Sequence, residues 1–404
     1  MNSGLASKRR FVLVLGCLTG IGAVTIDMSL PSIPGMAKDF TSTIGVGQQI
    51  VGIFMIGIAL GQVPAGLISD RIGRIPVLLT GVGIFTLAGV ITSISTSMEM
   101  MLLARFVQGL GASVGVVIAR AIVRDITSGK QAARLLSIMI MIFTAAPMLA
   151  PVVGGYLVSA FDWRAPFIAI TVFGALILFS INKGLQETHQ PNRKHHIIRQ
   201  LVNSVREFFS HRQSVLGVLL VVLPAMGFMS LITGSSALII DIYGFSVEQF
   251  GFIFALAGIS ILVGSLLNRH LLLRFSGEQL SGLGAASIGI AAIQLLFIAG
   301  SGDASFWWIW ACVCLYMFGT SFLLANATAM ALDPVPEISG AAASILGTTQ
   351  NLAAAMSALL TGALYDGTIR NVVFIMGIFG ILTALTFMLR GKVLHGQAIQ
   401  VPTD

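Results

Sequence analysis

Twelve apolar stretches, each separated from the next by a polar or charged break, run through almost the whole of this 404-residue chain. They cover residues 11–33, 46–68, 75–97, 99–121, 135–159, 164–182, 214–240, 250–268, 279–300, 307–331, 341–364 and 372–389. Because about 20 apolar residues in a helix cross a bilayer, each stretch predicts a membrane-spanning helix. Only 10% of the residues are charged and 56% are hydrophobic, which excludes an ordinary soluble domain. The expected fold is an all-α membrane protein with twelve transmembrane helices.

A polar segment, residues 183–213, divides these stretches six and six. It holds six of the 23 Lys and Arg residues and four of the six His residues. The sequence of residues 66–71, after the second stretch, is echoed by residues 264–269 after the eighth. Many secondary transporters consist of two such repeats around a central site. We therefore expect a six-helix bundle at 1–182, a cytoplasmic linker at 183–213 and a second, pseudo-symmetric six-helix bundle at 214–404.

The cations lie mostly in alternate breaks between the stretches. With the N-terminus inside, 19 of the 23 fall on the cytoplasmic side, and the outer loops hold only Lys38, Arg164 and Arg370. The excess of cations on one side predicts that both termini are cytoplasmic. The run that follows Lys8 is too long for a signal peptide and has no cleavage site after it, so we expect an uncleaved first span.

Asp27 lies inside the first apolar stretch, whereas the other fifteen acidic residues fall in predicted loops or tails. A carboxylate at the centre of a membrane helix costs about 2.5 to 3.5 kcal/mol, and intramembrane acids are usually functional. Asp27 is therefore the candidate proton-binding residue. The alternative is a helix-end carboxylate near the outer surface, which Pro31 and Pro34 would favour.

The break after the second stretch, residues 66–76, combines a turn with several charges. Gly73 permits a tight turn, Asp70 can accept hydrogen bonds from amides at a helix start, and the two arginines add charge-assisted contacts. The segment resembles the signature loop of the major facilitator superfamily at the following positions: Gly66, Asp70, Arg71, Gly73 and Arg74. The resemblance implies a cytoplasmic gate loop that closes against the start of the eleventh helix, although Ile75 replaces the usual third basic residue. Alternatively, these cations only set the topology.

The fourth stretch contains Arg105 and Gln108, which share one helix face because they are three residues apart. Together with the small residues that follow, they resemble the helix-four motif of the same superfamily. A buried guanidinium needs a partner, and the expected one is Asp27 or a group linked to Asp27 through water. We interpret Arg105 and Gln108 as an intramembrane charge partner and possible substrate site. The alternative is an arginine that extends to the outer surface.

The fifth stretch contains Pro147, Pro151, Gly154 and Gly155. This pattern resembles the helix-five motif found in antiporters more than in symporters, with Ala150 in place of a usual glycine. The prolines free backbone groups and the glycines permit close approach of a neighbouring helix. A purely structural bend is the alternative.

Three further stretches make the chain similar to the bicyclomycin/chloramphenicol resistance branch of the drug:proton antiporters: residues 27–31, residues 241–250, and residues 326–332 together with 340–344. The resemblance implies a multidrug efflux antiporter that exchanges protons for small amphiphilic antibiotics, such as phenicols or bicyclomycin-like compounds, across a bacterial inner membrane. We expect a monomer, because no motif in the chain implies an oligomer.

Two other functions compete with export of drugs. A specific metabolite exporter or importer of the same superfamily would need more fixed polar groups near the midplane. An enzyme is not expected, because the apolar stretches contain no nucleophile with its base, no paired acids and no metal cluster. The cysteines, Cys17, Cys312 and Cys314, lie in apolar runs, so we expect no disulfide and no metal. No cofactor and no nucleic-acid partner are expected either.

Overall fold

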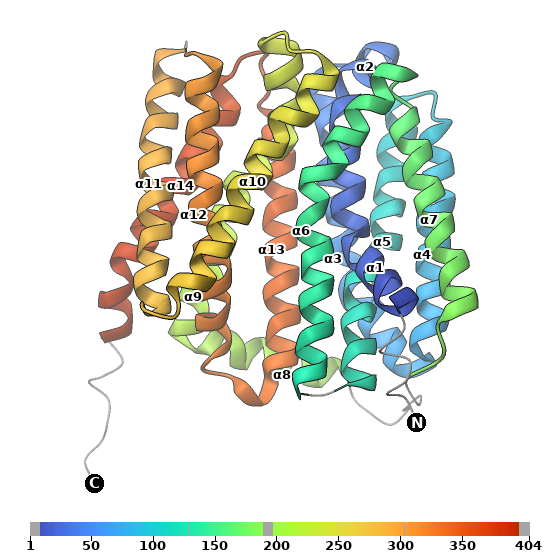
Figure 1. Cartoon of the computed structure of the whole chain (residues 1–404), viewed down its shortest axis with the longest axis vertical. Coiled ribbons are helices and arrows are strands. Elements are labelled where there is room, and N and C mark those ends of the chain that lie inside the picture. The colour runs from blue at the N-terminus through green and yellow to red at the C-terminus, as the bar shows by residue number, and fades with distance from the viewer. Residues whose placement is uncertain (1–8, 128, 189–196, 303, 396–404) are drawn as a thin grey trace. The chain divides into compact units, whose positions relative to one another are not determined.

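The computed structural model describes residues 9–127, 129–188, 197–302 and 304–395, and these residues are almost entirely helical (Figure 1). The helices of the first half are α1 (Arg9–Ser29), η1 (Leu30–Ser32), α2 (Ile33–Asp39), α3 (Ile44–Ile72), α4 (Arg74–Ser93), α5 (Met98–Ile126), α6 (Gly129–Ala160) and α7 (Ala165–Gly184). The others are α8 (Ile197–Ser210), α9 (Arg212–Ser236), η2 (Ala237–Ile242), α10 (Val247–Leu271), α11 (Gly277–Ser301), α12 (Phe306–Leu332), η3 (Pro336–Ile338), α13 (Ser339–Ala363) and α14 (Arg370–His395). The described part of the chain contains no strand. The predicted all-α class is confirmed.

Eleven segments of the described chain are long and apolar enough to cross a membrane, which confirms a multi-pass membrane protein. The predicted stretch 341–364 falls on α13, a 25-residue helix that is not among the eleven. Its first half carries Ser344, Thr348, Gln350 and Asn351, and these polar side chains lower its hydropathy. Counting α13, the described chain has twelve long helical segments, one for each predicted stretch.

The chain divides into two compact units. The first unit contains residues 1–195, 232–258 and 358–367, and the second contains residues 196–231, 259–357 and 368–404. The first unit thus includes pieces of α9, α10 and α13 beside the helices of the first half. The boundaries expected from the sequence, 1–182, 183–213 and 214–404, stay a prediction.

At the start of several helices, a side-chain oxygen accepts a hydrogen bond from a backbone amide that has no acceptor within the helix. Thr43, Ser97 and Ser305 accept hydrogen bonds from the backbone amides of Val46, Met100 and Trp308. Ser276 and Gln279 form a reciprocal capping box at the start of α11. Such caps satisfy backbone groups that the helix itself leaves open, which is why the polar breaks in the sequence coincide with helix ends.

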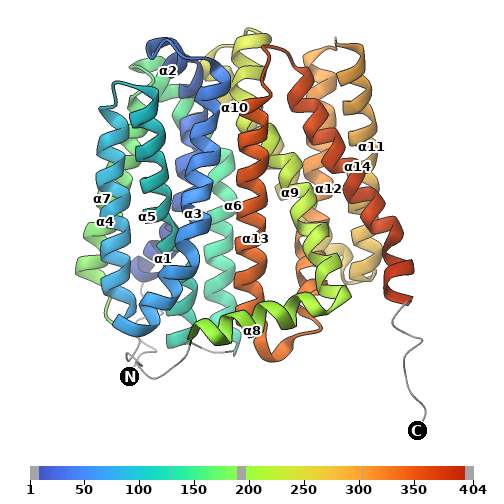
Figure 2. The ribbon, with the colours of Figure 1, turned by 180° about the vertical axis from the view of Figure 1, so that it is seen from behind.

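Within the first unit, α5 packs between α3 and α4 (Figure 2). A side chain at Gly109 would place its Cβ 2.1 Å from the carbonyl oxygen of Phe54, so the two backbones can approach this closely only at glycine. This close contact brings the phenyl ring of Phe54 beside Arg105, one turn earlier on α5.

Candidate functional site

Asp27 lies on α1, deep within a helical segment that continues through η1 and α2 to Asp39. Twelve residues separate it from the end of that segment, which is about 18 Å along a helix. Its side chain is buried, with 3% of the residue exposed, and it makes no hydrogen bond or ion pair with any residue that the structure describes. This position does not fit a carboxylate at the membrane surface.

Asp27 is also the one buried acid among the described residues. Every other acid within a described membrane helix lies within three residues of a helix end: Asp39, Asp70, Glu99, Asp125, Asp241, Glu248 and Glu278. Since burial away from water favours the neutral form of a carboxyl group, a single buried acid can take up a proton in one state of the protein and release it when water reaches it.

Arg105 is fully buried on α5. Its guanidinium donates to Oε1 of Gln108 at 3.0 Å and to Oγ of Ser29 at 2.5 Å. The rings of Phe54 and Phe167 lie 5.2 and 5.1 Å from its central carbon, close enough for cation–π contacts. Arg105 therefore ties α5 to the end of α1, and its full burial does not fit an arginine that extends to the surface.

The direct pair between Arg105 and Asp27 that the sequence suggested does not form in this structure. The hydroxyl of Ser29 takes the place of the carboxylate. Two residues along an α-helix correspond to a rotation of about 200°, so the side chains of Asp27 and Ser29 leave α1 on nearly opposite sides. The contact between Arg105 and Ser29 could not be predicted from the charged residues alone, because serine carries no charge.

Several buried polar atoms in the first unit have no partner among the described residues. They are Nε of Arg105, Nε2 of Gln108, both side-chain amide atoms of Gln48, Oγ of Ser32, Oγ1 of Thr233 and Oγ of Ser236. Buried polar groups are rarely left unpaired, so these atoms can bind water or a polar substrate group. Gln48 and Ser32 were not predicted as site residues, because their only signal in the sequence is a polar residue within or beside an apolar stretch.

The segment 66–76 forms a charged network at the junction of α3 and α4. Gly73 has a φ of 104°, a conformation that favours glycine. Arg74 is buried, hydrogen-bonds Asp125 on α5 at 2.9 Å and Ser69 at 2.7 Å, and pairs with Asp70. Of the predicted loop residues, Asp70, Gly73 and Arg74 thus lie together at this junction, and the carbonyl oxygen of Gly66 accepts a hydrogen bond from the hydroxyl of Ser69 at 2.8 Å. Arg71 is exposed.

Glu187, which was not predicted as a site residue, completes this network. Its carboxylate accepts hydrogen bonds from the backbone amides of Arg74 at 2.9 Å and Ile75 at 3.0 Å. A carboxylate at a helix start satisfies open amides and interacts favourably with the helix dipole. The residue lies over 110 positions away along the chain, in the predicted linker, so local patterns could not pair it with α4.

We expect Glu187→Ala to destabilise the start of α4 more than Glu187→Gln does, because glutamine keeps an acceptor oxygen. Loss of hydrogen bonds to a charged group costs about 1.5 to 3 kcal/mol. Thermal unfolding of the purified protein in detergent measures the effect as a lower midpoint for the alanine variant. Glu207→Ala, which removes an exposed acid from α8, is the matched control. Equal midpoints for Glu187→Ala and the control would contradict the capping role.

The helix-five motif lies against α1 beside Asp27. A Cβ on Gly154 would stand 2.2 Å from the carbonyl oxygen of Met28, and a Cβ on Gly155 would stand 2.5 Å from that of Val247. α6 continues as a helix through Pro147 and Pro151. Gly154 therefore permits the close approach of α6 to α1 at the residue that follows the buried carboxylate, and Gly155 permits the approach of α6 to the start of α10.

Gly154→Val should reduce transport strongly, because the valine side chain forces α6 away from α1 and opens the surroundings of Asp27 to water. Overpacking of this kind costs about 1 to 3 kcal/mol. The rate of drug efflux is measured with equal amounts of variant and wild-type protein in the membrane. Gly83→Val is the control, because a Cβ at Gly83 meets nothing within 4 Å. Wild-type efflux by Gly154→Val would show that the close contact is dispensable.

Two further hydrogen bonds lie within the first unit and involve residues from the second half of the chain. The hydroxyl of Tyr365, between α13 and α14, donates to Oδ2 of Asp241 at 3.0 Å, and Ser159 hydrogen-bonds Glu248. Burial, and then the neighbouring Asp241 carboxylate, raise the pKa of Tyr365. The phenol therefore stays protonated and remains a donor at physiological pH.

Comparisons with known proteins agree with this architecture. Residues 15–355 match the Major Facilitator Superfamily. The chain is 28% identical over 380 residues to the bicyclomycin resistance protein homolog of Haemophilus influenzae, covering 93% of this chain and 95% of the relative. It is 26% identical over 377 residues to multidrug resistance protein D of Escherichia coli, covering 93% and 94%.

Solved structures show the same fold. A bacterial homolog of the human lysosomal transporter Spinster aligns with a TM-score of 0.76 at 17% identity, covering 96% of this chain and 98% of the other. A D-xylose–proton symporter aligns with a TM-score of 0.72 at 16% identity, covering 94% and 96%. The superfamily match extends over most of the chain, and the expected resemblance is confirmed: this chain belongs to the major facilitator superfamily.

Proposed function

We propose that the protein is a proton-coupled multidrug efflux antiporter of a bacterial inner membrane, with both termini in the cytoplasm and Asp27 as the proton carrier. The observation that carries the proposal is the single buried acid, which has no partner among the described residues and lies in the middle of a membrane helix. The names of the relatives, bicyclomycin resistance and multidrug resistance proteins, support small amphiphilic antibiotics as substrates. The proposed assembly is a monomer.

The network of Arg105, Gln108 and Ser29 supplies a fixed polar region among aromatic and aliphatic side chains. Adaptable apolar surfaces suit promiscuous binding of drugs, and a few polar groups orient the substrate. Membership of a transporter superfamily supports transport in preference to an enzymatic reaction.

The first test is drug susceptibility of a strain that overexpresses the protein. Tolerance of phenicols or bicyclomycin-like compounds should rise, and a protonophore should abolish the increase. Unchanged tolerance together with uptake or export of a single metabolite would replace drug efflux by specific metabolite transport.

A single proton carrier also predicts the charge moved in each cycle. Exchange of one proton for a neutral drug moves one net charge, whereas exchange for a monovalent cation moves none. One charge crossing 100 mV is worth about 2.3 kcal/mol, enough for roughly a 50-fold gradient of neutral drug. Transport in proteoliposomes, with voltage and pH gradient imposed separately, measures this. Voltage-driven export of a monovalent cation would require a second proton and contradict Asp27 as the sole carrier.

A further inference from the structure

Helix α8 is amphipathic, and part of its apolar face is exposed. Phe208 is fully buried, whereas Val202, Val205 and Phe209 are 59%, 36% and 39% exposed. With 3.6 residues per turn, these three exposed side chains lie within about 60° of one another around the helix. An amphipathic helix with an exposed apolar stripe beside membrane-spanning helices is typical of a segment that lies in the membrane interface.

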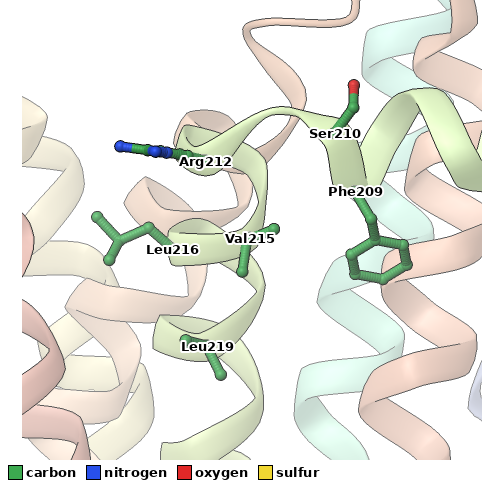
Figure 3. A pocket seen from close by; sticks show the side chains of 6 residues that line it. All are labelled: Phe209, Ser210, Arg212, Val215, Leu216 and Leu219. Atoms are coloured by element: carbon green, nitrogen blue, oxygen red, sulfur yellow. The ribbon is translucent and has the colours of Figure 1, made fainter. Parts of the chain in front are cut away.

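A hollow of about 280 Å³ lies at the corner where α8 ends and α9 begins, entirely within the second unit. It is lined by Phe209, Ser210, Arg212, Val215, Leu216 and Leu219. Figure 3 shows Phe209 extending from the end of α8 on one side, with Arg212 and Leu216 extending from α9 on the other. We call this the α8–α9 hollow.

The lining changes from polar to apolar along α9. Ser210 and Arg212 lie at the end where the helix starts, and Leu219 lies seven residues further on, about 10 Å along the axis. A polar end followed by an apolar wall of this length matches the junction between a phospholipid headgroup and its acyl chains.

The polar end is cationic and has no acid in its lining. Arg212 is exposed and makes no hydrogen bond or ion pair with any described residue. The hydroxyl of Ser210 donates to the carbonyl oxygen of Glu207 at 2.7 Å, so its proton is already used. Among the lining side chains, Arg212 is therefore the available donor, and the ligand it favours is an anion with acceptor oxygens, such as a phosphate.

The same combination recurs at the end of α10. A second hollow, of about 430 Å³, is lined by Leu266, Arg269, His270 and Leu273. Because α9 and α10 are consecutive membrane-spanning helices, the start of α9 and the end of α10 lie at the same membrane face. Basic side chains beside exposed leucines thus occur twice at this face of the second unit, as expected for a surface in contact with anionic lipid.

We propose that the α8–α9 hollow binds an anionic phospholipid from the leaflet on which α8 lies. Arg212 pairs with the headgroup phosphate, and one acyl chain lies along Val215 and Leu219. The phenyl ring of Phe209 covers the other side of this acyl chain, which couples the position of α8 to the bound lipid.

The test is a titration of the full chain, purified in neutral detergent, with phosphatidylglycerol and with phosphatidylcholine, read by native mass spectrometry. Wild-type protein should retain phosphatidylglycerol preferentially. Arg212→Gln should weaken that binding roughly tenfold, the effect of losing a charge-assisted hydrogen bond. Arg206→Gln is the matched control, because it removes an exposed arginine of α8 that does not line the hollow, and it should change binding less than about twofold.

The apolar wall is tested with dihexanoyl phosphatidylglycerol, which has the same headgroup on short chains. The short-chain lipid should compete poorly with the long-chain lipid for binding. Leu219→Ser should reduce the difference in affinity between the two lipids. Equal losses in Arg206→Gln and Arg212→Gln would indicate general surface charge, and equal retention of phosphatidylcholine would indicate an apolar hollow without headgroup recognition. Either result would overturn the proposal. Because the readout is binding, it is independent of whether the protein exports drugs.

Discussion

Asp27→Asn abolishes proton-coupled efflux and leaves the protein in the membrane: this is the expected result with the largest effect. Asparagine has nearly the same shape as aspartate but cannot exchange a proton. The described membrane helices have no other buried acid that could substitute. Drug export by cells and uphill export by proteoliposomes should fall to the level of the empty vector or empty liposomes.

Two further measurements make the Asp27 result specific. The amount of variant in the membrane is compared with wild type, because loss of a buried charge without a partner should not destabilise the fold. Asp27→Glu, which keeps a carboxyl group on a longer side chain, should retain part of the activity. Normal uphill export by Asp27→Asn would remove Asp27 as the proton carrier.

The second large effect is expected at Arg105. Arg105→Ala leaves Oγ of Ser29 and Oε1 of Gln108 without their donor and opens a void between Phe54 and Phe167. Each buried polar group left unpaired costs about 1 to 3 kcal/mol, so the link between α1 and α5 should loosen. We expect transport to fall at least roughly tenfold, at 1.4 kcal/mol per decade.

Lysine at position 105 separates charge from geometry. Its single ammonium keeps the charge but cannot form the planar contacts of a guanidinium with two acceptors and two rings. Arg105→Lys should therefore fold but transport poorly, as measured by efflux rate at equal membrane levels. Arg206→Ala, which removes an exposed arginine from α8, should leave transport unchanged. Full activity in Arg105→Ala would show that the contact with Ser29 is not needed.

The membrane helices could be predicted from the sequence because hydropathy and length are properties of continuous segments. The prediction placed even α13 correctly, although its polar first half lowers its hydropathy. Asp27 could be singled out for the same reason, since one carboxylate in a long apolar stretch is visible without a fold.

Partners across the fold were harder to predict. The sequence paired Arg105 with the nearest intramembrane charge, whereas the structure pairs it with the neutral hydroxyl of Ser29, 76 positions away. Glu187 was assigned only to the linker, because its bonds to α4 join residues 112 and 113 positions apart. Such contacts depend on how helices rotate and pack, and neither charge counts nor periodicity contain that information.

The attachment of Glu187 to α4 also fixes the chain that follows α7. Thr188 hydrogen-bonds Asp125 at 3.3 Å, so two consecutive residues bind two different helices of the first unit, the start of α4 and the end of α5. A shift of the end of α5 relative to the start of α4 must therefore break one of these bonds or move the end of α7 with it.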